Sequence, residues 1–128
     1  MRKSAGDKVL YPELSYKIMQ IIFEVHNKLG PGFTEEIYEE AAAYELEAQQ
    51  ILIERQKVIQ VIYKGRVVGT YRLDLVIDGK IILELKAVTA LNDLFKQQLL
   101  SYLKATDLHL GMLVNFGTKR VEYTRIVN

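Results

Sequence analysis

With 128 residues, 49% of them hydrophobic and 26% charged, the chain has the length and composition of one ordinary globular domain. Its apolar runs fall far short of the roughly 20 residues that a membrane span needs, and the lack of cysteine excludes disulfides and thiolate metal sites. The N-terminus does not resemble a signal peptide, so we expect a cytoplasmic protein with no membrane partner. A single domain over residues 1–128 is expected, with 1–11 as a flexible lead-in.

Two helices are expected in the N-terminal third. Apolar residues recur at helical spacing over 12–29. The segment Gly30-Pro31-Gly32 stops this helix, because proline lacks an amide donor and glycine allows positive φ. Thr34 is a suitable N-cap for a second helix that runs to about Gln49 and carries acidic residues in its first turn.

The pattern changes after the second helix. Residues 58–86 are rich in β-formers, and the turn signals Lys64-Gly65 and Asp78-Gly79 divide them into three antiparallel strands. A third helix is expected over 92–105, capped by Asn92 or Asp93, and two strands follow near 108–116 and 121–127. This order (ααβββαββ) predicts an α/β (α+β) domain in which helices flank a central mixed sheet.

The turn at Asp78-Gly79 decides which residues face one another. A two-residue loop would pair apolar with charged side chains. A three-residue loop over 78–80 makes one face continuous hydrocarbon, through the pairs Ile77 with Ile81, Leu75 with Leu83, and Leu73 with Leu85. This register also places Asp74 opposite Glu84, with Cβ atoms about 4.5–5.5 Å apart. Lys86 then follows on the same face.

Two facing carboxylates repel each other unless something binds them. A divalent cation with hard oxygen ligands, Mg²⁺ or Mn²⁺, would resolve the conflict. Lys86 would then lie where it can orient a water or stabilise charge on a phosphate. The alternative is a surface ion-pair cluster in which Lys86 and Arg72 neutralise the two acids. The residues alone leave both interpretations open.

The charges are segregated along the chain. Residues 34–54 contain seven acids and no bases, and residues 55–73 contain five bases and no acids. Such segregation can produce a basic face that attracts phosphates, or simply two solvated surfaces of opposite sign. The candidate bases are Arg55, Lys57, Lys64, Arg66 and Arg72.

Asp74, followed after nine residues by Glu84-Leu85-Lys86, resembles the D…(D/E)xK signature of the PD-(D/E)XK nuclease superfamily. The proline that often precedes the first aspartate is replaced by Leu73. The segment from Gly32 to Tyr38 resembles the signature of the GxxExxY proteins, a small bacterial branch of that superfamily. Three further segments are similar to that branch: 25–33, 98–103 and 113–117.

The resemblance implies a restriction-endonuclease-like core and a role for each matching residue. Asp74 and Glu84 would be metal ligands, with the Leu85 carbonyl as a third and Glu35 reaching toward the metal from outside the sheet. Lys86 would be the catalytic lysine. Gln98 and Tyr102 would share one helix face and position the lysine, the attacking water or a phosphate.

Two other residues have two interpretations each, and a third has one. His26 either approaches the site or packs near the end of the first helix. Tyr38 either orients Glu35 with its hydroxyl or is a packing residue. His109 is expected to be structural.

The leading hypothesis is a metal-dependent nuclease that hydrolyses phosphodiester bonds of DNA, in preference to RNA. The alternative is a module that keeps the nuclease fold but only binds nucleic acid or a protein partner. A purely structural protein would leave the facing Asp74 and Glu84 unexplained. A single site cuts one strand at a time, so cleavage of both strands would suggest a homodimer.

Overall fold

The structure, a computed structural model, describes residues 10–128, so most of the lead-in expected over 1–11 lies outside the described residues. Helix α1 (Pro12–Leu29) has the expected bounds, and α2 (Glu35–Ala48) begins directly after Thr34. Leu10 and Tyr11 pack against the core beside α1. No helix among residues 10–128 is long and apolar enough to cross a lipid bilayer.

The rest of the chain forms one sheet and a third helix. The elements are β1 (Ile53–Tyr63), β2 (Arg66–Ile77), β3 (Ile81–Lys86), α3 (Asp93–Thr106), β4 (Leu110–Asn115) and β5 (Glu122–Val127). The strands lie in the order β1-β2-β3-β4-β5, with β3 and β4 parallel and the other neighbours antiparallel. The expected order of elements and the mixed sheet are therefore confirmed.

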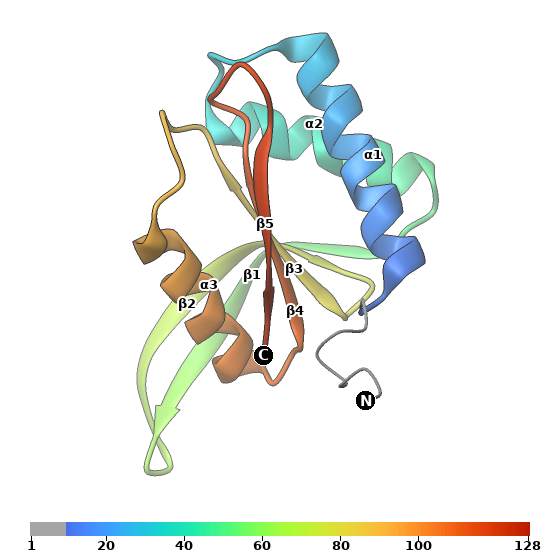
Figure 1. Cartoon of the computed structure of the whole chain (residues 1–128). Coiled ribbons are helices and arrows are strands. Elements are labelled where there is room, and N and C mark those ends of the chain that lie inside the picture. The colour runs from blue at the N-terminus through green and yellow to red at the C-terminus, as the bar shows by residue number, and fades with distance from the viewer. Residues whose placement is uncertain (1–9) are drawn as a thin grey trace, which may run out of the picture.

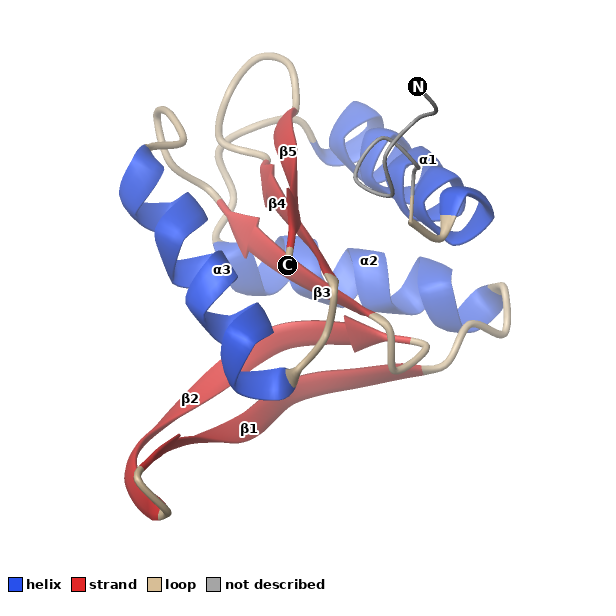
Figure 2. Ribbon diagram, turned by 60° about the horizontal axis from the view of Figure 1, so that its bottom comes forward, coloured by secondary structure: helices blue, strands red, loops and turns tan. Residues whose placement is uncertain are grey.

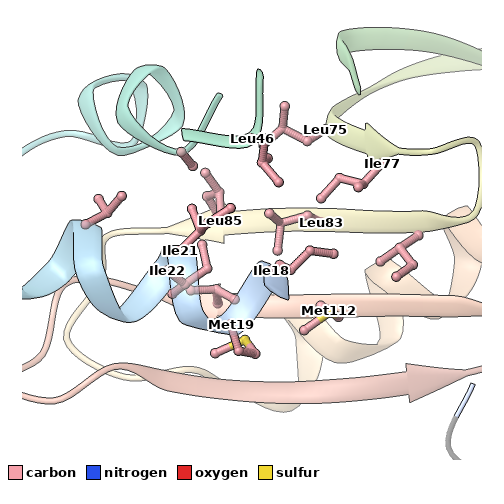
Figure 3. Packing of buried hydrophobic residues seen from close by; sticks show 14 of the residues in the cluster. Ile18, Met19, Ile21, Ile22, Leu46, Leu75, Ile77, Leu83, Leu85 and Met112 are labelled. Atoms are coloured by element: carbon pink, nitrogen blue, oxygen red, sulfur yellow. The ribbon is translucent and has the colours of Figure 1, made fainter. Parts of the chain in front are cut away.

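Helices cover both faces of the sheet (Figure 1). Helices α1 and α2 pack on one face, where Ile18, Ile22 and Leu46 meet Leu75, Leu83 and Leu85 (Figure 3). Helix α3 packs on the other face against a smaller cluster that includes Val76, Ile82 and Leu113. Gly111 allows this close approach, because a Cβ there would lie 2.8 Å from the Leu99 side chain.

Strand β1 begins at Ile53, earlier than the expected start at Val58. Its first residues include Glu54, Arg55 and Lys57, whose charges hide the strand pattern. They are nevertheless in register with the second half of β2. Backbone pairing with β2 therefore sets the start of β1. The sequence there lacks the alternation of apolar and polar residues that would predict a strand.

The predicted hairpin register is confirmed where β2 and β3 pair, since Ile77 lies opposite Ile81 and Leu75 opposite Leu83. The expected pair of Leu73 with Leu85 does not form. Leu73 joins the cluster under α3, whereas Leu85 joins the cluster under α1 and α2. The strand is irregular at this point: the β1–β2 register skips Gln56, which has a left-handed φ of 49°. One hydrocarbon face along all three pairs was therefore a wrong expectation.

Candidate active site

Asp74 and Glu84 lie where the pairing of β2 and β3 ends. Beyond Leu75 and Leu83, each carboxylate reaches across to the backbone of the other strand. The amide of Asp74 donates to Glu84 Oε2 at 2.8 Å, and the amide of Leu85 donates to Asp74 Oδ2 at 2.8 Å. These two side chains take the place of backbone ladder bonds, so both carboxylates are fixed between the strands.

The second oxygens of the two carboxylates are not shut off from solvent. Asp74 Oδ1 and Glu84 Oε1 accept no hydrogen bond from residues 10–128. In the same part of the chain, every side-chain oxygen or nitrogen that is shut off from solvent has a hydrogen-bond partner. The two free oxygens therefore remain accessible as ligands.

The pair is electrostatically strained without a cation. Burial, reinforced by the charge of Asp74, raises the pKa of Glu84 to about 8. Burial also raises the pKa of Asp74, and the charges of Glu39 and Glu35 add to this effect. Glu84 is only 6% exposed. A bound cation would favour the ionised form of both groups, because an opposite charge lowers a carboxyl pKa.

Lys86 ends β3 and lies beside this pair. Its charge lowers the pKa of both carboxyl groups, and its Nζ sits 4.7 Å from the centre of the Phe95 ring on α3. Over residues 10–128, neither Lys86 nor Arg72 forms an ion pair with Asp74 or Glu84. The interpretation of these residues as a surface ion-pair cluster is therefore wrong.

Glu35 is the first residue of α2 and is exposed. It lines a hollow together with Phe33, Thr34, Glu36 and Ala87, so the start of α2 lies next to the residue that follows Lys86. Its charge raises the pKa of both Asp74 and Glu84. Within the described chain, however, no three Asp, Glu or His side chains are grouped closely enough to hold a metal. Glu35 therefore faces the site from a distance and is not grouped with the other two acids.

Tyr102 approaches the carboxylates from α3. It is 6% exposed, and its ring lies 5.0 Å from that of Tyr71. Burial, followed by the charge of Glu84, raises the pKa of Tyr102 to about 12, so its hydroxyl is protonated and can donate a hydrogen bond. Gln98 lies one turn earlier and is half-buried, and its side chain has no hydrogen bond within residues 10–128.

Two residues near the site were missed at the sequence level. Glu39 is buried and accepts hydrogen bonds from Arg55 at 3.0 Å and Gln56 at 2.7 Å. Its spacing of four residues from Glu35 was the available signal, because such residues share a helix face. Asn115 was the other. It lies within 113–117, one of the segments that resemble the GxxExxY branch, but that resemblance gave it no role.

Asn115 holds the segment that follows Lys86. It is fully buried, and its Oδ1 accepts from the amides of Val88 and Gly117, both at 2.9 Å. Its Nδ2 donates to the Val88 carbonyl and to Glu122 Oε1, both at 3.0 Å. Asn115 also lies beside Lys86 in the parallel pairing of β3 and β4. Asn115 therefore fixes the backbone of the segment that follows Lys86.

Tyr38 and His26 are packing residues. The Tyr38 hydroxyl donates to the Gly30 carbonyl and accepts from the Phe33 amide, and its ring stacks on Phe116 at 4.3 Å. No hydrogen bond joins it to Glu35 in the described structure. His26 Nε2 lies 2.9 Å from the Thr118 carbonyl. His109 Nδ1 lies 3.2 Å from the carbonyl of Asn128, which agrees with its expected structural role.

The donor set fits a hard divalent cation. Mg²⁺ commonly binds through one or two carboxylates and keeps several waters, so Asp74 and Glu84 satisfy its minimum requirement. Both offer an accessible oxygen, and both would lose their mutual repulsion. The Leu85 carbonyl, between Glu84 and Lys86, is the candidate third ligand.

Comparisons with known proteins show the superfamily and the fold of the chain. The sequence profile of the PD-(D/E)XK nuclease superfamily matches residues 12–126. A search of curated protein sequences gives no significant match. The chain is similar in fold to SSO0001, with a TM-score of 0.53 and 22% identity, covering 73% of this chain and 50% of that one. It is also similar to an alkaline exonuclease (LHK-Exo) from Laribacter hongkongensis, with a TM-score of 0.54 and 12% identity, covering 100% of this chain and 72% of that one.

The chain thus spans half the length of SSO0001. Both structural likenesses support the restriction-endonuclease-like core that the resemblance to the superfamily implied. The profile match extends over nearly the whole chain and includes the hairpin that carries Asp74 and Glu84. The chain belongs to the PD-(D/E)XK nuclease superfamily.

Proposed function

We propose that this protein is a Mg²⁺- or Mn²⁺-dependent nuclease that hydrolyses phosphodiester bonds of DNA in preference to RNA. The observation that carries the proposal is the pair Asp74 and Glu84, fixed between two strands with one open oxygen each and no basic ion-pair partner among residues 10–128. A retired site would be expected to lose one member of the set, whereas acid, acid and lysine are all present here.

The divalent cation would supply Lewis acidity at the scissile phosphate and neutralise the carboxylate pair. Asp74, Glu84 and the Leu85 carbonyl would hold it. Glu35 stands further away and would act on the site through water.

Lys86 would orient the attacking water or stabilise the charge that develops on the phosphate oxygens. The Phe95 ring beneath its ammonium group restrains the side chain. On α3, Tyr102 and Gln98 would donate hydrogen bonds to the phosphate or to the water. Water would form a bond to phosphorus as the ester P–O bond breaks, and the leaving oxygen would take up a proton.

Cleavage assays test this function directly. The purified protein is incubated with single-stranded, double-stranded and branched DNA and with RNA, in Mg²⁺ or Mn²⁺. Asp74→Ala and Lys86→Ala are expected to abolish cleavage. Asp78→Ala and Lys80→Ala are the matched controls, because they make the same changes in the β2–β3 turn at the other end of β3. Tight binding without cleavage by the wild type would favour the binding-module alternative.

Two narrower proposals accompany this one. Gly32 to Tyr38 support membership of the GxxExxY branch, because the Tyr38 hydroxyl closes the turn before α2 through its hydrogen bonds with Gly30 and Phe33.

A homodimer is proposed only if the protein cuts both strands of a duplex at one position. Sedimentation of the protein with and without duplex DNA would test this.

A further inference from the structure

The far ends of β1 and β2 leave the body of the protein. After Ile59 on β1 and before Leu73 on β2, every residue of this two-stranded ribbon (60–72) is exposed except the half-buried Val61. Both views show the ribbon projecting beyond α3, with its turn far from the other strands (Figures 1 and 2). A two-stranded ribbon has little stability of its own in water. The length of the ribbon therefore indicates a function other than stabilising the core.

The bases of this region divide into two groups. Arg55 and Lys57, near the body, are paired with acids of the protein: Arg55 with Glu39 and Glu40, and Lys57 with Glu54. The other three, Lys64, Arg66 and Arg72, lie on the ribbon and form no ion pair with any residue from 10 to 128. No acid occurs between residues 55 and 73 to offset them. The ribbon is thus a cationic projection.

The ribbon is continuous with the candidate active site. Tyr71 contacts Tyr102, whose pKa is raised by the charges of both Glu84 and Asp74. Arg66 lies eight residues along β2 from Asp74. At about 3.3 Å per residue, the ribbon carries its terminal charges roughly 26 Å from the carboxylates, which is the length of about eight base pairs at 3.4 Å each.

We propose that the ribbon formed by residues 60–72 is an arm that binds double-stranded DNA beside the cleavage site. This inference rests on the proposed nuclease function and specifies its substrate class. The major groove of B-DNA is about 12 Å wide and admits a two-stranded ribbon, whereas the major groove of A-form RNA is too narrow and deep for side chains to read. Lys64 and Arg66 at the tip bind phosphates about eight base pairs from the scissile bond.

The ribbon also has exposed apolar side chains, so the test must distinguish DNA from a second copy of the chain as the partner that binds it. Ile62, Val67 and Val68 are each more than half exposed. A second copy of the chain could cover them, since unpaired and exposed strands are sites of self-association. Charge complementarity favours DNA, because two copies would bring the same unpaired bases together.

The test compares two double variants. Lys64→Gln with Arg66→Gln removes the tip charges, and Lys17→Gln with Lys80→Gln removes two charges around a hollow at the opposite end of β3 from Lys86. Binding to a duplex of about 30 base pairs is measured by fluorescence anisotropy in EDTA at several salt concentrations, beside double-stranded RNA of equal length. The tip variant is expected to raise the Kd for DNA at least about tenfold and to reduce the slope of log K against log salt by about 1.8.

The control variant and the binding of RNA are expected to change little. Equal losses in both variants, or no loss in the tip variant, would overturn the proposal. So would a tip variant whose sedimentation shows a broken dimer while its DNA affinity is unchanged. The proposed function fails separately, if the wild type binds duplex DNA through the ribbon but cuts no substrate in Mg²⁺ or Mn²⁺.

Discussion

Asp74 and Glu84 exchange hydrogen bonds across two strands: the amide of Asp74 donates to the Glu84 carboxylate, while the Asp74 carboxylate accepts from the amide that follows Glu84. The backbone thus holds two carboxyl groups together in a partly buried position. Hydrogen bonds from amides favour the charged forms, but burial outweighs them in both groups, so both pKa values are raised. The charge of Asp74 adds to this effect at Glu84, and the charges of Glu39 and Glu35 add to it at Asp74. A bound cation would favour the ionised form of both carboxyl groups, as proposed above.

The first prediction concerns stability against pH without metal. Burial and the charge of Asp74 raise the pKa of Glu84 from 4.5 to about 8. Between these values the folded protein binds a proton that the unfolded chain releases, so the free energy of unfolding falls as pH rises. In EDTA, the Tm is expected to be lower at about pH 8.5 than at about pH 5.5. The free energy of unfolding should fall over the same range by an amount on the order of a few kcal/mol.

Glu84→Gln removes the titrating group, and its pH dependence is expected to be much flatter. Glu45→Gln, the same substitution on α2, is the matched control and should melt with the wild-type pH dependence. Parallel curves for Glu84→Gln and the wild type would contradict the assignment of this dependence to the buried pair.

The second prediction concerns metal and stability. Adding Mn²⁺ is expected to raise the Tm, because a ligand that binds only the folded state stabilises it. The increase should be larger at high pH, where the carboxyl pair gives up its protons readily. Asp74→Asn is expected to abolish the increase, and Asp78→Asn, in the β2–β3 turn, to retain it. An equal effect of Mn²⁺ on both variants would place the cation elsewhere.

The third prediction separates catalysis from folding at Lys86. Lys86→Met keeps the length of the side chain and its contact with Phe95 but loses the charge. Removing one electrostatic contact of this kind costs roughly 10²- to 10³-fold in kcat. Melting should change little, since Lys86 is half-buried and has no ion pair among residues 10–128. Lys80→Met is the control, and retained turnover in Lys86→Met would exclude the lysine from the chemistry.

The hairpin register was predictable because apolar matching specifies it: shifting β2 by one residue would move Leu75 and Ile77 from the cluster under α1 and α2 to the opposite face, under α3. The position of Leu73 was not predictable in the same way. It depends on carboxylates that bond to the opposite backbone and on Gln56 in a left-handed conformation, and neither feature alters the alternation of residue types. The alternation of apolar and polar residues therefore does not predict which face Leu73 joins, next to the candidate site.

The parts of the site that are formed by distant segments could not be predicted from the sequence either. Asp74, Glu84 and Lys86 share one hairpin, so local spacing was sufficient to associate them. Asn115 joins Val88, Gly117 and Glu122, and that arrangement exists only after the β3–α3–β4 crossover is folded. A single asparagine at the end of an apolar strand gives no sign of it.

The fourth prediction tests Tyr38 as a structural residue. Tyr38→Phe leaves the Phe33 amide and the Gly30 carbonyl without their partner. The free energy of unfolding is expected to fall by about 1–2 kcal/mol in urea titrations. Tyr44→Phe, at a position 72% exposed, is the control and should have no measurable effect. A Tyr38→Phe protein of normal stability but lowered kcat would instead restore the interpretation that its hydroxyl orients Glu35.

The last prediction concerns Asn115, which never touches the carboxylates but anchors the chain next to Lys86. Asn115→Ala leaves the Val88 amide and carbonyl and the Gly117 amide unpaired in a buried place, at a cost of about 2–4 kcal/mol. Because the loss is local, hydrogen exchange at the Val88 and Gly117 amides should accelerate far more than at core amides of β4.

Asn115→Asp is the informative companion variant. It keeps the acceptor for the two amides but loses the donor to Glu122 and places a second negative charge beside it. The Val88 and Gly117 amides should therefore stay protected, although the protein is less stable than the wild type. If both variants exchanged these amides at the wild-type rate, the segment after Lys86 would be held by the sheet alone, and Asn115 would have no part in positioning the lysine.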